Sequence, residues 1–262
     1  MHYLSLSLSR KRGFSLVELS IVLVILGLLV GGVLSGQSLI RAAELRAVTT
    51  EYSRYVTSVQ SFRDKYFALP GDMTNATSFW GAMTNCGVAS PSGTGTQTCN
   101  GNADGFVSAA AGGASQTVES LAFWQQLANA GLIEGRYTGI VGTAAANDWD
   151  IGTNIPRSKL SGGGWTTGSR TSYTTGSGVN FDGFWRNWFY VLGDGNGTDI
   201  TLLLPEESWN IDTKLDDGKP GTGKAVARWT GCTDAASGAV LAANYLLSTT
   251  SKVCDIRFVE AF

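Results

Sequence analysis

The sequence predicts an α+β protein in which one long N-terminal helix is followed by a head of antiparallel strands and short helices. An apolar run over residues 14–34 continues, without a proline, as an amphipathic pattern to residue 67. Runs with the composition of β-strands begin at residue 185 and are separated by glycine-rich turns. A helical segment followed by a separate set of strands is typical of α+β proteins.

The apolar run is long enough to cross a membrane. From Phe14 to Leu34 it is interrupted only by Glu18, two serines and three glycines, and a membrane-spanning helix needs about 20 apolar residues. A lone charge near the middle of a bilayer costs roughly 2.5–3.5 kcal/mol on insertion scales, so an acid within a span is a functional candidate. Glu18 is therefore the first candidate functional residue.

The helical pattern extends beyond the span. Apolar residues at spacings of three and four form one stripe of an amphipathic helix: Leu39, Ala42, Leu45, Val48, Tyr52, Val56, Val59, Phe62 and Tyr66. The opposite face is expected to carry the charges, with Glu51 and Arg54 one turn apart and able to pair. Pro70-Gly71-Asp72 ends the helix. The expected helix, residues 14–67, is roughly 80 Å long.

The first part of the head is expected to be poor in regular structure. A short helix is predicted over Glu119–Ile133, with Thr117 as its N-cap and Gly131 as its stop. The low-complexity segment 161–180 is expected to form a surface loop.

Four strands are expected in the rest of the head, over residues 185–192, 199–204, 224–230 and 255–260. The glycine-rich segment 193–197 indicates a hairpin between the first two strands. A helix is predicted to begin at Pro205, because proline suits the first helical position and Glu206 and Glu207 suit the positive end of the helix dipole.

The charges that flank the span predict its orientation. Arg10, Lys11 and Arg12 precede it, and positive flanks stay in the cytoplasm, so the chain after Leu34 is expected outside. Four cysteines lie in that part, and an even number in an exported domain favours two disulfides. The sequence allows three arrangements of two disulfides. We predict the arrangement Cys86–Cys99 with Cys232–Cys254, because it closes the shortest loops.

Free buried thiols are the alternative to disulfides. A zinc site is not expected, because no C-x-x-C spacing exists and the single histidine is His2.

The segment Arg10-Lys11-Arg12-Gly13-Phe14-Ser15-Leu16-Val17-Glu18-Leu19 resembles the class III leader of type IV pilins and of the pseudopilins of type II secretion. The resemblance implies that a prepilin peptidase cleaves after Gly13 and N-methylates Phe14, so that Glu18 becomes the fifth residue of the mature chain. It further implies three parts: a leader (1–13), a helix (transmembrane 14–34, amphipathic 35–67) and a globular head (68–262) whose antiparallel sheet the helix packs against, as in the pilin fold.

The same segment has two simpler interpretations. An ordinary secretory signal has an apolar core of about 7–15 residues and a small-x-small cleavage site, which Val33-Leu34-Ser35-Gly36 matches only loosely. A plain membrane anchor gives no reason for Glu18 or for the glycine at the junction of charges and apolar residues.

The sequence departs from many type IV pilins at Ser35, where they often carry a proline. The flanking Gly31, Gly32 and Gly36 offer two interpretations, which stay open. In the first, each glycine lowers helix stability by about 1 kcal/mol relative to alanine. In the second, the glycines allow close helix packing within the membrane.

The resemblance implies a structural subunit of a type IV pilus or of a secretion pseudopilus. The precursor is expected in the bacterial inner membrane as a single-pass protein with a periplasmic head, and the assembled filament in the periplasm or at the cell surface. The implied partners are copies of the chain or related pilins, the prepilin peptidase, an inner-membrane assembly platform and membrane lipid. A pilin-scaffold adhesin that binds glycans and, more weakly, a membrane-tethered enzyme are the alternatives.

Composition argues against two other classes of protein. Without residues 1–13 the chain carries 16 Lys and Arg against 21 Asp and Glu, a formal charge of −5, whereas nucleic-acid binding usually needs a basic patch. No histidine follows the leader, and neither a G-x-S-x-G elbow nor a Walker loop is present, so we expect no enzyme.

Three acidic loops are candidate calcium sites. Residues 100–105 have the oxygen spacing of an EF-hand start, but Ala111 stands where the closing glutamate belongs. The second cluster is Asp194, Asn196 and Asp199. The third and preferred cluster, Asp212, Asp216 and Asp217, resembles the calcium loop of the major pseudopilin. Asp, Asn and Gly are also the commonest turn residues, so a purely structural role stays open.

Aromatic residues are dense between residues 165 and 190 and form the candidate sugar-binding platform of the adhesin hypothesis. The set comprises Trp165, Tyr173, Phe181, Phe184, Trp185, Trp188 and Tyr190. Packing in the core explains Trp188 and Tyr190 equally well, because alternate residues of a strand point to the same face.

Overall fold

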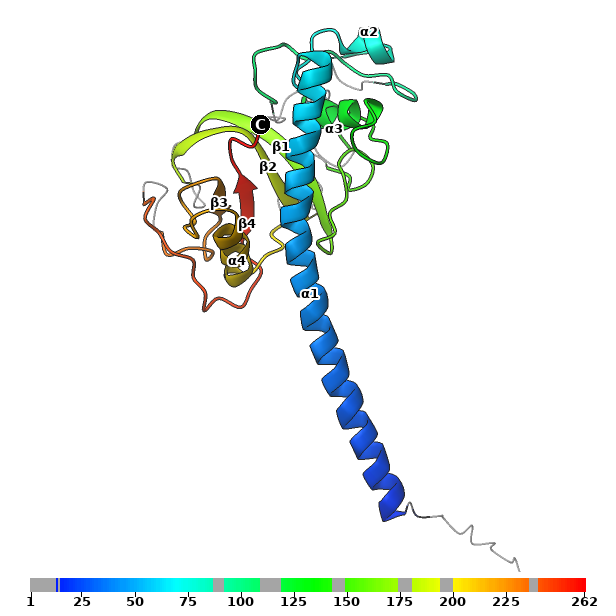
Figure 1. Cartoon of the computed structure of the whole chain (residues 1–262), viewed down its shortest axis with the longest axis vertical. Coiled ribbons are helices and arrows are strands. Elements are labelled where there is room, and N and C mark those ends of the chain that lie inside the picture. Colours follow the sequence, from blue (N-terminus) through cyan, green and yellow to red (C-terminus); the bar gives the residue numbers. More distant parts are fainter. Residues whose placement is uncertain are drawn as a thin grey trace, which may run out of the picture. The chain divides into compact units, whose positions relative to one another are not determined.

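The computed structural model describes residue 13 and residues 15–86, 92–108, 119–142, 149–173, 181–193, 200–235 and 240–262. Its elements are α1 (Leu16–Tyr66), α2 (Ala76–Trp80), α3 (Glu119–Asn129), β1 (Gly163–Tyr173), β2 (Gly183–Gly193), α4 (Pro205–Leu215), β3 (Ala225–Arg228) and β4 (Asp255–Phe258), as labelled in Figure 1. The predicted α+β class and the long N-terminal helix are confirmed.

The chain divides into two compact units within α1. The first is Met1–Ala43, and the second, which we call the head unit, is Glu44–Phe262. The second half of α1 therefore belongs to the same compact unit as the sheet.

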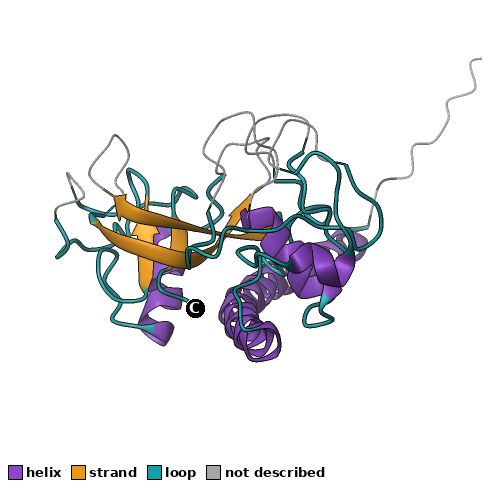
Figure 2. Ribbon diagram, turned by 90° about the horizontal axis from the view of Figure 1, so that it is seen from above, coloured by secondary structure: helices purple, strands orange, loops and turns teal. Residues whose placement is uncertain are grey.

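The head unit contains a four-stranded antiparallel sheet with the order β1-β2-β4-β3. β1 and β2 pair from Gly163 opposite Gly193 to Tyr173 opposite Gly183, whereas β2 meets β4 through two residue pairs. The helices of the head unit lie on one side of this sheet (Figure 2).

Both faces of the central strand β2 are buried, and its side chains alternate between two apolar clusters. Phe189 and Val191 belong to the cluster on the helix side. Trp188, Tyr190 and Leu192 belong to a second cluster on the other side. This alternation is the period of two that a strand imposes.

The second half of α1 supplies one wall of the main core. Val48, Tyr55, Val59 and Phe62 are at most 1% exposed. The Tyr55 ring meets the rings of Trp124 and Trp165 edge-on, at centroid distances of 4.9 and 5.4 Å. The predicted stripe contained the other three of these α1 residues but not Tyr55, which stands one position beside it.

Glu51 lies on the buried side of α1, so its predicted place on the charged outer face is wrong. The carboxylate accepts hydrogen bonds from Ser158 Oγ (2.7 Å), Trp165 Nε1 (2.8 Å) and the backbone N–H of Lys159 (3.0 Å). Both carboxylate oxygens are therefore engaged by residues more than 100 positions away, whereas the Arg54 guanidinium donates to Tyr55 Oη (3.4 Å) and keeps an electrostatic attraction to Glu51. Three donors offset the cost of burying the charge.

Two predictions of local structure are corrected. Residues 163–173, predicted to be loop, form strand β1, because their threonine and aromatic residues pair with the apolar strand β2. Residues 200–204, predicted to be strand, make single bridges through Ile200 and Leu203. The predicted helix cap Thr117 and the turn residues 194–199 lie outside the described residues.

The remaining elements agree closely with expectation. Helix α3 ends at Asn129, short of the predicted Ile133, and Gly131 follows with a positive φ of 74°, as helix stops favour. Both disulfides have the nearest-neighbour pairing, Cys86–Cys99 and Cys232–Cys254. Cys232 and Cys254 are fully buried.

We expect Glu51→Ala to lower the free energy of unfolding by on the order of 3 kcal/mol, because the variant leaves buried donors on Trp165 and Ser158 unsatisfied. Thermal melting of the detergent-solubilised full chain, followed by tryptophan fluorescence, measures this loss. Asp64→Ala, at an exposed acid of the same helix, is the matched control and should melt with the wild type. Equal melting of the two variants would contradict the assigned role of Glu51.

Candidate assembly segment and acidic loop

The expected cleavage site precedes helix α1. Gly13 has no described neighbour within 4 Å of the place where a Cβ would stand, and the helix begins at Leu16. Phe14, the expected methylation site, lies outside the described residues. The Gly13–Phe14 bond therefore lies before the helical hydrogen bonds start.

A capping box opens α1 and involves Glu18. The Glu18 carboxylate accepts a hydrogen bond from the Ser15 backbone N–H (2.8 Å), and Ser15 Oγ accepts one from the Val17 N–H (3.3 Å). This is a capping box of the type Ser-x-x-Glu at a helix start, in which the serine oxygen accepts from the second helical N–H instead of the third. The residues around Glu18 in the sequence are Leu, Val, Ile and Ser, which predicts no partner for its carboxylate within its own helix. This prediction is wrong, because the Ser15 backbone N–H at the helix start is its partner. The Ser15-x-x-Glu18 spacing was readable in the sequence and was missed.

The first part of α1 presents an apolar surface all round. Every leucine, isoleucine and valine from Leu16 to Leu34 is at least half exposed. The segment is long and apolar enough to cross a membrane, and an exposed apolar area of this extent marks a surface for lipid or for other helices.

In the head unit, Asp212, Asp216 and Asp217 are brought together where α4 ends. One carboxylate oxygen from each lies within 4.8 Å of the others. Asp212 is fully buried and accepts hydrogen bonds from Tyr245 Oη (2.8 Å) and the Gly218 N–H (3.1 Å). This is the preferred calcium cluster of the sequence.

The other two acids of this cluster hold the loop that follows α4. Asp216 accepts hydrogen bonds from the backbone N–H groups of Lys224 and Ala225. Asp217 accepts from Thr222 Oγ1 (2.6 Å) and the Lys219 N–H (2.8 Å). The three carboxylates therefore shape this loop and, at the same time, concentrate negative charge.

Burial raises the pKa of Asp212 to about 7, and the neighbouring carboxylates of Asp217 and Asp216 act in the same direction. The hydrogen bonds from Tyr245 and Gly218 act in the opposite direction. A pKa near 7 means that Asp212 loses its proton within the neutral pH range.

The other two calcium candidates have different outcomes. In the first loop, Asp104 accepts from Asn102 Nδ2 (3.0 Å) and the Phe106 N–H (2.8 Å), which are turn contacts. The buried Asp72 beneath it accepts from the Gly105 N–H (2.9 Å). Asp194, Asn196 and Asp199 lie outside the described residues.

Five of the seven aromatic residues of the expected sugar platform are buried, so the hypothesis is wrong for these five, and the side chains of Tyr173 and Phe184 lie outside the described residues. Trp165, Phe181, Trp185, Trp188 and Tyr190 are each at most 3% exposed. They fill the two apolar clusters on either side of the sheet.

Residues 8–34 match the family model described as the prokaryotic N-terminal methylation motif. This motif is typical of type IV pilins and pseudopilins, which confirms the resemblance of residues 10–19. Comparisons with curated proteins and with solved structures give no match. Together with the one long apolar helix, the motif fits a single-pass membrane-anchored precursor.

The raised pKa of Asp212 predicts that its contribution to stability falls as the pH rises. Between about pH 4 and pH 7 the folded chain keeps this proton while the unfolded chain, with an aspartate pKa of about 3.9, has lost it. In chelator, the full chain should therefore melt at lower temperature at pH 8 than Asp212→Asn, which mimics the protonated acid.

The gap between the two melting temperatures should close as the pH falls to about 4, because both chains are then uncharged at this position. A gap that is constant across this range, or a less stable Asn variant at pH 8, would contradict the raised pKa.

Proposed function

We propose that this chain is a prepilin-like structural subunit that is cleaved after Gly13, N-methylated at Phe14 and assembled through α1 into a helical filament. The observation that carries the proposal is the methylation motif at residues 8–34, on a helix whose leucine, isoleucine and valine side chains from Leu16 to Leu34 are at least half exposed. Such a surface needs lipid around it before assembly and other helices around it afterwards.

Processing and assembly involve partners that the motif implies. A prepilin peptidase acts on the precursor in the inner membrane, and an assembly platform in that membrane receives the product. Arg10, Lys11 and Arg12 keep the leader in the cytoplasm and leave the head in the periplasm. The filament is a type IV pilus or a type II secretion pseudopilus, built from copies of this chain or related pilins.

The capping box supports a role for Glu18 in assembly. One carboxylate oxygen, Oε2, accepts the Ser15 N–H, and the described residues offer no second donor. Cleavage creates a cationic amine at Phe14, and the amine of a neighbouring subunit can pair with the half-satisfied carboxylate. Such a pair relieves two buried charges and selects one axial register between subunits.

Calcium at Asp212, Asp216 and Asp217 would stabilise the head during export. Calcium binds oxygens at 2.3–2.6 Å, so ligand atoms around one ion are at most about 5 Å apart, and the three carboxylates satisfy this spacing. The ion would place a positive charge among the three carboxylates, whereas the ammonium group of Lys219 in the same loop donates to Asn244 Oδ1 (2.8 Å).

Calcium should raise the melting temperature of the full chain at pH 7.5 relative to chelator. Binding at a hundredfold excess over Kd contributes about 2.7 kcal/mol, or roughly 5–10 °C for a unit of this size. Asp217→Asn, which removes one exposed ligand, should reduce the shift, whereas Asp234→Asn, at an acid outside the cluster, should keep it. Identical melting in chelator and in millimolar calcium would leave these acids with their turn role alone.

Replacing Glu18 by glutamine should leave cleavage intact and strongly reduce filament yield. Glutamine keeps an acceptor for the Ser15 N–H but removes the charge that pairs with the amine. Cleavage should survive because the peptidase recognises the Gly13 junction. A processing blot and a sheared-filament assay, run side by side, measure the two outcomes.

Ser15→Ala separates pairing from capping. It removes the hydroxyl half of the capping box and keeps the Glu18 charge, so it should assemble far better than Glu18→Gln. A wild-type filament yield from Glu18→Gln would show that assembly does not need the charge pair. Equal loss in both variants would reduce Glu18 to a helix cap.

A further inference from the structure

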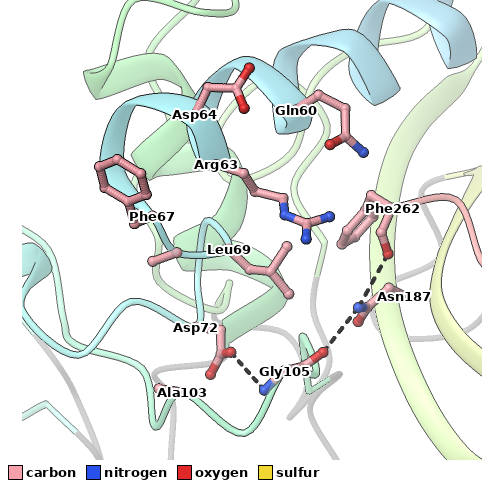
Figure 3. Close-up of a pocket in the computed structure, with 11 residues that line it drawn as sticks. Gln60, Arg63, Asp64, Phe67, Leu69, Asp72, Ala103, Gly105, Asn187 and Phe262 are labelled. Atoms are coloured by element: carbon pink, nitrogen blue, oxygen red, sulfur yellow. Dashed lines mark hydrogen bonds between the residues drawn. The ribbon is translucent and has the colours of Figure 1, made fainter.

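A groove of about 790 Å³ lies in the head unit at the end of α1 (Figure 3). Its wall comes from the last turns of α1 and residues 67–69, and its floor from Asp72, Gly105 and Asn187. This volume lies in the usual range for sites of small ligands. Figure 3 shows the side chains of Gln60 and Arg63 directed into the groove.

Phe67 lies at the rim of the groove and combines a strained backbone with an exposed apolar side chain. It is the residue after the last turn of α1 and adopts a left-handed backbone with a φ of 54°, a position that favours glycine or asparagine and strains a bulky residue. Its ring is 93% exposed. Neither helix capping nor core packing explains a phenylalanine here, so the ring is best explained by a contact outside the chain.

The floor of the groove is held rigidly. Asn187 lies in the middle of β2 with a φ of 40° and donates hydrogen bonds from Nδ2 to the carbonyls of Gly105 (3.1 Å) and Phe262 (3.5 Å). Its Oδ1 accepts from the Val107 N–H (3.0 Å). Ala103, which also lines the groove, has a left-handed backbone. Asparagine accepts a positive φ readily, so of these two residues only Ala103 is strained. Strained residues persist where the surroundings fix them, and they cluster at binding sites.

The polar side chains of the groove wall are available to bind a ligand. Gln60, Arg63 and Asp64 are exposed, and the described residues give their side chains no hydrogen bond or ion pair. Together they offer donors and acceptors at one surface. Arg63 is accompanied by two acids, Asp64 and Asp72, so the groove has no excess positive charge to attract an anion.

We propose that this groove binds a neutral oligosaccharide, with the Phe67 ring stacked on one sugar face and with Gln60 and Arg63, which point into the groove, bonded to hydroxyl groups. A sugar is a neutral molecule that presents both donors and acceptors beside apolar C–H faces, which matches this combination of side chains. The assignment goes beyond the filament role, since a subunit can assemble whether or not its head binds a ligand. It differs from the buried aromatic set of β1 and β2.

The test uses the full chain, solubilised in a detergent without a sugar head group, on an array of neutral hexose and N-acetylhexosamine oligosaccharides. Sialylated and sulfated glycans on the same array are the anionic comparison. We expect binding to neutral glycans, weakened about tenfold or more in Phe67→Asn, because loss of an apolar ring contact is worth on the order of a factor of ten. Arg63→Gln should weaken binding too.

Three controls separate binding from folding. Phe67→Asn should melt no lower than the wild type, because asparagine accepts the left-handed backbone. Phe67→Tyr, which keeps the ring, should retain binding. Phe79→Asn, at a half-exposed ring that does not line the groove, should also bind normally.

The proposal is overturned if no neutral glycan binds, if only anionic glycans bind, or if Phe67→Asn binds like the wild type. If no glycan binds and Phe67→Asn also lowers the filament yield, the ring makes a contact between copies of this chain instead.

Discussion

The buried carboxylate of Glu51 is the interaction on which the head unit depends. Three donors from residues 158–165 converge on it, so only one rotation of the second half of α1 satisfies both the charge and its partners. That rotation places Val48, Tyr55 and Phe62 against the sheet. A purely apolar helix face can slide or turn at modest cost, whereas a buried charge without its donors is expensive.

Three acids illustrate how the number of donors decides the role of a carboxylate. Glu51 has donors on both oxygens and is structural. Glu18 has one backbone donor and keeps an oxygen for a partner outside the chain. Asp212 has two donors, yet burial and two neighbouring acids raise its pKa to about 7. Under the proposed function, each of the last two pairs with a cation: the amine of a neighbouring subunit for Glu18 and calcium for Asp212.

Much of the fold could be predicted because it depends on local patterns. The span, the start of α4 at Pro205 and the nearest-neighbour disulfides follow from neighbouring residues. The inward position of Glu51 could not be predicted, because its partners are more than 100 residues away. Strand β1 has the composition of a loop and becomes a strand through its pairing with β2. The Ser15–Glu18 capping box was local and readable, while the exposure of Phe67 depends on the path of the chain after α1.

The central claim is that the motif is processed and that the product enters a filament. The mass of the N-terminal peptide of the wild-type chain, recovered from sheared filaments, tests it most directly. The account predicts a chain that begins at Phe14 and carries one methyl group on its amine. A chain that retains residues 1–13, or one cut near Ser35 as a secretory signal would be, would contradict it.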